Sequence, residues 1–140
     1  MATGIRDALK IVCEWAEKST PSGSVYATLD ALIGGRVGYG QTGSGFKNTQ
    51  ACIVIQTQAM DSEFDALVQS DRYVIKCYGG TVDPHDATDV FRAVYDVFHN
   101  AHGDTATGGI IRSAFETGSL VWEQETNYPY YMAVFEILTT

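Results

Sequence analysis

The stretch 71–103 constrains the fold most strongly, because a strand pattern runs directly into a helix pattern. Residues 72–78 are mostly β-branched or aromatic and end at a glycine pair, which is typical of a strand. Asp83 then stands at an N-cap position with Pro84 at the first helical position, and apolar residues recur at helical spacing over 87–101. The sequence therefore predicts a sheet with a helix packed on it.

The remaining apolar patterns predict two more helices and four more strands. The last three strands follow one another with short links, which favours an antiparallel meander. We therefore expect a single α+β domain over 1–140, with helices on one sheet face and the other face either solvated or covered by a partner. The predicted helices are 5–17, 25–33 and 83–102, with one helical turn at 63–67, and the predicted strands are 51–57, 72–78, 110–117, 119–126 and 130–139.

Composition and charge exclude several classes of protein. Seventeen acidic residues against nine basic ones give a formal net charge of −8, and the basic residues are scattered singly, so no stripe that could grip nucleic acid is expected. No apolar run approaches the roughly 20 residues that span a bilayer, and the N-terminus lacks a signal-peptide pattern. Cys13, Cys52 and Cys77 each lie within an apolar pattern, so we expect buried thiols in a reducing compartment.

The glycine-rich stretch 34–49 contains a match to the dinucleotide-binding pattern G-x-G-x-x-G at 38–43. That pattern requires a strand before the glycines and a helix after them, whereas here a predicted helix precedes them and a predicted strand follows. We therefore expect no nucleotide or other cofactor. A flexible loop of this length is commonly functional, and Tyr39 and Phe46 make it a candidate arm that orders against a neighbouring molecule.

Other groups that could carry chemistry have simple structural explanations. His99 and His102, with Asp104 beyond them, could be drawn as metal ligands, but histidines near a helix C-terminus also interact favourably with the helix dipole, and no third ligand is fixed. No serine lies in a nucleophile elbow and no cysteine has a nearby histidine. The sequence therefore predicts neither a catalytic nor a metal site.

The segment around the last turn carries paired acids and tyrosines. Glu123 and Glu125 share one face of a predicted strand, and a solvated face explains them better than a cation site or a shared proton. Tyr128 and Tyr130 flank Pro129, where a protein interface and cross-strand packing are equally good explanations. The Tyr128–Pro129 bond is either cis or trans.

The run 29–37 (Leu-Asp-Ala-Leu-Ile-Gly-Gly-Arg-Val), a loop and the predicted strand 51–57 together resemble the first half of a known family. That family is the tail-completion, or tail-terminator, proteins of long-tailed, siphovirus-like bacteriophages. The predicted strand 73–78, the helix through 90–98 and the closing strand 131–138 continue the resemblance in the same order. It covers most of the chain and rests on element order and on the apolar-Gly-Gly-Arg-Val signature.

This resemblance implies a structural virion protein without enzymatic activity, cofactor or membrane contact. It implies a homo-hexameric ring that caps the tail tube, stops tail polymerisation and forms the head–tail joining surface. The implied partners are other copies of the chain, the tail tube protein and the head–tail connector or neck proteins, and DNA would pass through the ring without specific binding. The implied location is the tail or neck of the virion, after assembly in the host cytoplasm.

A ring of this kind requires two different complementary patches on each subunit. The glycine-rich arm and the hairpin 119–131 are the natural candidates. The candidate interface residues are Arg36, Tyr39, Phe46, Lys47, Glu123, Glu125, Tyr128 and Tyr130.

Two alternatives stay open. One is a head-completion or neck connector protein (a stopper), which element order barely separates from a terminator. The other is a small α+β ligand-binding domain or enzyme. A deep pocket with convergent polar groups, or a shifted pKa at His85 or His99, would favour that second alternative.

Overall fold

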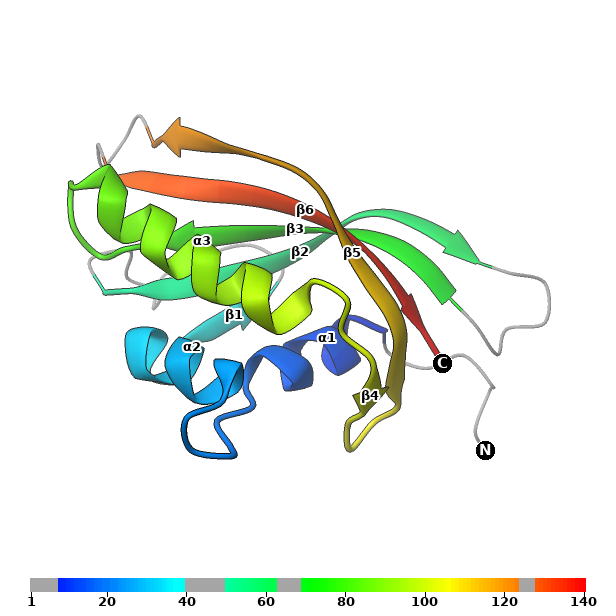
Figure 1. Cartoon of the computed structure of the whole chain (residues 1–140). Helices are drawn as coiled ribbons and strands as arrows, with labels where there is room; N and C mark the ends of the chain where they lie inside the picture. The colour runs from blue at the N-terminus through cyan, green and yellow to red at the C-terminus, as the bar shows by residue number, and fades with distance from the viewer. Residues whose placement is uncertain (1–7, 40–49, 63–68, 124–127) are drawn as a thin grey trace.

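The computed structural model describes residues 8–39, 50–62, 69–123 and 128–140, which form three helices and a six-stranded sheet (Figure 1). The helices are α1 (Ala8–Ala16), α2 (Val25–Ile33) and α3 (Pro84–Phe98). The strands are β1 (Val37–Tyr39), β2 (Cys52–Ser62), β3 (Gln69–Tyr78), β4 (Gly103–Asp104), β5 (Gly109–Trp122) and β6 (Pro129–Thr139). The sheet order is β1-β2-β3-β6-β5-β4, and the predicted α+β class is confirmed.

The helix ends follow the local sequence. The Asp83 carboxylate accepts a hydrogen bond from the backbone N–H of His85 at 2.9 Å and so caps α3, with Pro84 in the first turn as predicted. Ser24 caps α2 in the same way through the N–H of Ala27. Gly34 ends α2 in the left-handed conformation at φ 57°, which glycine adopts at little cost.

The sheet is mixed, so the expectation of a purely antiparallel sheet is wrong at one edge. β1 runs parallel to β2, whereas the other neighbouring strands pair antiparallel. β1 falls inside the stretch 34–49, where the glycine content predicts a loop. It forms because the backbone carbonyl of Arg36 accepts a hydrogen bond from the N–H of Ile53 at 3.1 Å, which starts a ladder that Val37 continues.

β5 is one continuous strand where the sequence predicts two. Gly118 does not interrupt it: a register shift lies just before it, between Phe115 and Thr117, and pairing with β6 continues through Gly118 to Trp122. A Cβ atom at Gly118 would lie 2.7 Å from Cε1 of Tyr131, so this glycine allows the close approach of a ring. The predicted strands 110–117 and 119–126 are therefore one strand, and β4, β5 and β6 are the three consecutive strands that pair antiparallel at this side of the sheet.

α1, α2 and α3 cover one face of the sheet, and the main core lies between them and the strands (Figure 1). Trp15 of α1 is 2% exposed and donates from Nε1 to the backbone carbonyl of Val97 at 3.0 Å, which ties α1 to α3. Tyr73, Phe98 and Phe135 fill the middle of this core. No helix in the described part of the chain is long and apolar enough to cross a membrane.

Several local expectations can be compared directly with the structure. The predicted burial of the three thiols is confirmed: Cys13, Cys52 and Cys77 are all free and buried. β2 and β3 extend beyond the predicted strands, to Ser62 and from Gln69. The predicted helical turn at 63–67 lies outside the described residues. A cis proline bond occurs at Thr20–Pro21.

Candidate functional site

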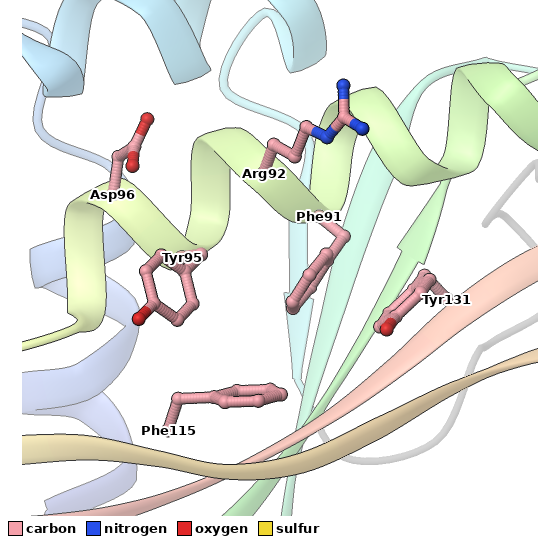
Figure 2. A pocket seen from close by; sticks show the side chains of 6 residues that line it. All are labelled: Phe91, Arg92, Tyr95, Asp96, Phe115 and Tyr131. Atoms are coloured by element: carbon pink, nitrogen blue, oxygen red, sulfur yellow. The ribbon is translucent and has the colours of Figure 1, made fainter.

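An open hollow of about 440 Å³ lies between α3 and the strands β5 and β6 (Figure 2). We call it the aromatic hollow, and it is lined by Phe91, Arg92, Tyr95, Asp96, Phe115 and Tyr131. Four rings form its walls, and the two charged side chains of α3 extend away from the rings at its rim. The lining is therefore apolar inside and carries one positive and one negative group at its border.

The rings of the aromatic hollow hold one another in fixed orientations. Phe91 stacks on Tyr131 with the ring centroids 4.0 Å apart and an interplanar angle of 18°. Phe115 meets Tyr95 edge-on at 5.5 Å, and on its other side it packs against the core residue Phe135 at the same distance. The walls are thus continuous with the core, which makes the hollow a preformed feature.

His99 stabilises the wall near the C-terminus of α3 and does not point to a metal site. Its ring stacks on Tyr95 at 4.6 Å, and its Nδ1 atom accepts a hydrogen bond from the N–H of Phe115 at 3.4 Å. Within the described ranges, no group of three or more His, Cys, Asp or Glu residues is arranged to hold a metal ion. The combination of His99, His102 and Asp104 therefore does not form a ligand set.

β5, which contributes Phe115 to the hollow, has a free edge over most of its length among the described strands. β4 pairs with the beginning of β5 through Gly109 and Ile110, and no other described strand lies on the outer side of β5. Leu120 and Trp122 are 40% and 47% exposed on this edge strand. A free edge that displays large apolar side chains is a typical place for another chain to bind.

A second candidate, which we call the tyrosine cluster, lies on the sheet face opposite the helices. Tyr78 and Tyr130 pack across adjacent strands with the ring centroids 5.1 Å apart. The Nζ atom of Lys76 lies 5.4 Å from the centre of the Tyr130 ring. Glu123 accepts a hydrogen bond from the Tyr78 hydroxyl, and its backbone N–H donates to the carbonyl of Tyr128 at 3.0 Å.

The pKa shifts in and beside the tyrosine cluster indicate a structural role for these side chains and not a catalytic one. Burial raises the pKa of Tyr78, and the negative charge of Glu123 raises it further; burial and the same carboxylate also raise the pKa of Tyr130. Burial raises the pKa of the neighbouring Cys52 thiol to about 12, although the Arg36 guanidinium opposes the shift. Burial likewise raises the pKa of Cys77. These groups are therefore neutral at pH 7, and neither thiol is activated as a nucleophile.

The structure brings together only part of the residue set proposed from sequence. Glu123 and Tyr130 meet in the tyrosine cluster, and Arg36 lies at its border, where Nε donates to the carbonyl of Ala51 at 2.7 Å. Tyr39 belongs to β1, opposite Ile55. Phe46, Lys47 and Glu125 lie outside the described residues.

Sequence reasoning missed the aromatic hollow altogether. Phe91 and Tyr95 stand four residues apart on α3, so they share a side of the helix. Neither is fully buried, unlike Val90 and Val94 beside them. A pair of half-exposed aromatic residues at the edge of an apolar helix face was the available signal, but the sequence does not show that β5 leaves the space open.

Comparison with known proteins supports the fold alone. No protein-family model matches the sequence, and no curated protein matches it. A solved chain described as "Virion of native gene transfer agent (GTA) particle" is similar in structure, with a TM-score of 0.57 and 18% sequence identity. The similarity covers 83% of this chain and 91% of that chain.

Proposed function

We propose that this protein is a structural component of a phage-like virion that caps the tail tube as a homo-hexameric ring. In this role it stops tail polymerisation and forms the surface on which the head is joined. The observation that carries the proposal is the structural similarity to a chain of a gene transfer agent virion, which covers 83% of this chain and 91% of that chain. The sequence resemblance to tail terminators specifies the role within the particle.

The exposed features of the fold suit a protein that acts by contact. No described strand pairs with the outer side of β5 beyond Ile110, and Leu120 and Trp122 offer apolar surface on this strand. The aromatic hollow has Phe115 of β5 in its wall, and its rings pack on one another and on the core without a partner present. A preformed surface of this kind loses little conformational entropy on assembly, so we assign it to contacts with the tail tube or the connector.

The charge of the chain is compatible with DNA passing through such a ring. A formal net charge of −8 repels a polyanion and gives no phosphate grip. The buried, protonated thiols and the absence of a metal-ligand group among the described residues give no support to catalysis. We therefore propose an assembly role without enzymatic activity, located in the tail or neck.

Deletion of the gene, followed by electron microscopy of the lysate, tests this role. The expected result is unjoined heads together with tails of uncontrolled length, and complementation with the wild-type gene should restore joined virions. Headless tails of normal length would instead assign the protein to the neck, as a stopper. Normal virions would contradict both assignments.

A further inference from the structure

The segment 40–49 carries one aromatic residue and one charged residue, and the two are adjacent. Phe46 and Lys47 stand among glycines and uncharged polar residues in the run Gly-Gln-Thr-Gly-Ser-Gly-Phe-Lys-Asn-Thr. The segment lies outside the described residues, between Tyr39 at the end of β1 and Gln50 before β2. The chemistry that it offers to a binding partner is therefore a ring followed directly by a cation.

The aromatic hollow offers the complement of the ring. Its volume of about 440 Å³ falls within the range of pockets that enclose small apolar groups. Phe91 lies 5.6 Å from Phe115 and 6.2 Å from Tyr95, measured between ring centroids, and stacks on Tyr131. A further ring inserted into this space would contact several rings at once, in the offset or edge-on arrangements that aromatic pairs prefer.

The rim of the hollow offers the complement of the cation and gives the occupant a direction. Arg92 and Asp96 are exposed and stand one turn apart on α3, and neither has an ion-pair partner among the described residues (Figure 2). Asp96 attracts a cation that follows the inserted ring, whereas Arg92 repels it. The order of Phe46 and Lys47 satisfies this requirement when Lys47 lies toward the C-terminal end of α3.

The length of the segment favours the hollow of another copy over its own. Gln50 lies against Gly80, just before α3, because a Cβ atom at Gly80 would be 2.8 Å from the carbonyl carbon of Gln50. Lys47 is three residues from Gln50, so its backbone extends at most about 10 Å from there. Asp96 lies about 18 Å along α3 from Pro84, at the helical rise per residue. The backbone of Lys47 therefore falls well short of Asp96 in the same chain.

We propose that the segment 40–49 of one copy docks in the aromatic hollow of the next copy, with the Phe46 ring among the four rings and Lys47 beside Asp96. The inference rests on the proposed function for the ring, whereas the contact itself rests on the match between segment and hollow. β1 lies at one edge of the sheet, and β5, which walls the hollow, lies next to the other edge (Figure 1). The contact is therefore heterologous and repeats from copy to copy. The free edge of β5 then remains for the tail tube or the connector.

Substitutions of Phe46 test the aromatic anchor. Sedimentation velocity of the full chain at low salt should show the wild type as oligomers. Phe46→Ala should assemble at least about tenfold more weakly, as loss of a central anchor does at other interfaces. Phe46→Tyr keeps a ring and should assemble nearly as well as the wild type, and Gln41→Ala is the control for loss of another side chain of the segment. Circular dichroism checks that each variant is folded.

Charge swaps test which copy provides the hollow. Lys47→Asp and Asp96→Lys should each weaken assembly roughly threefold or more, because the segment and the rim then carry the same sign. Glu17→Lys is the control for an equal charge change outside the hollow. In an equimolar mixture of the two swapped chains, the segment of each meets a rim of opposite sign only in the other chain, so the mixture should restore oligomers.

The outcomes separate this inference from the proposed function. A Phe46→Ala chain that forms rings as well as the wild type would overturn the contact and leave the capping role intact. A wild type that stays monomeric at low salt would also overturn the contact. So would a mixture that fails to assemble while a chain with both swaps succeeds, because the segment would then occupy its own hollow. Normal virions after gene deletion would overturn the capping role, while the mixing result would still report on the contact.

Discussion

The Cys52 side chain lies on the sheet face opposite the helices and is 1% exposed. A thiolate at this buried position would lack solvation by water. This cost of ionisation raises the pKa of the Cys52 thiol to about 12. In an unfolded chain the same thiol titrates near its ordinary value of about 8.5. Folding therefore favours the protonated form, and the contribution of Cys52 to stability depends on pH.

The sign of this dependence gives a first prediction. The raised pKa contributes stability that is complete below about pH 8.5 and is lost as the pH rises toward the folded value. We expect the free energy of unfolding of the wild type to fall over this range, and Cys52→Ala to show a shallower fall. Urea unfolding at several pH values measures both slopes. Identical slopes would show that Cys52 is not desolvated in the folded state.

Gly118 gives a second prediction at the same scale. A methyl group at this position would collide with the Tyr131 ring, which forms one wall of the aromatic hollow by stacking on Phe91. Gly118→Ala should destabilise the protein by roughly 1–3 kcal/mol, as overpacking does elsewhere. Ser119→Ala, at the exposed neighbouring position, is the control and should change stability little. Equal thermal midpoints for the two variants would count against the close approach.

Among the elements, α3 contributes both to the core and to the aromatic hollow. The carboxylate of Asp83 satisfies a backbone N–H that the first helical turn leaves without a partner. Asp83→Ala should therefore cost about 1 kcal/mol, whereas Asp83→Ser keeps a capping oxygen and should cost less. Chemical denaturation resolves the difference, and two equally stable variants would mean that the cap contributes nothing.

Elements with strong local signals were predictable from the sequence, and elements set by pairing were not. The cap and apolar face of α3 and the end of α2 at Gly34 depend on nearby residues, so the pattern locates them. β1 forms because it pairs with β2, where Val37 lies opposite Ile53. Its three residues are too few to show a strand pattern in the sequence. β5 continues through Gly118 because β6 pairs with the residues before and after this glycine. The sequence near Gly118 does not show that pairing, because the partner residues are distant in the chain.

At the scale of the whole molecule, the candidate sites also divide into those set by nearby residues and those set by residues distant in sequence. Tyr130 and Glu123 could be proposed from a short segment, and both belong to the tyrosine cluster. The aromatic hollow could not be proposed, because Phe115 and Tyr131 are far from Phe91 in sequence and only the fold brings the three rings together.

The proposed function requires assembly with other molecules and no chemical reaction. The fold similarity to a virion chain extends over most of this molecule, and a closed ring of identical copies needs contacts that repeat with a fixed polarity.

The length distribution of tails in electron micrographs provides the sharpest test. Lysates without the protein should contain tails of widely spread length and no joined heads, and the wild-type gene supplied in trans should restore one narrow length with heads attached. A narrow length distribution in the absence of the protein would contradict the capping role.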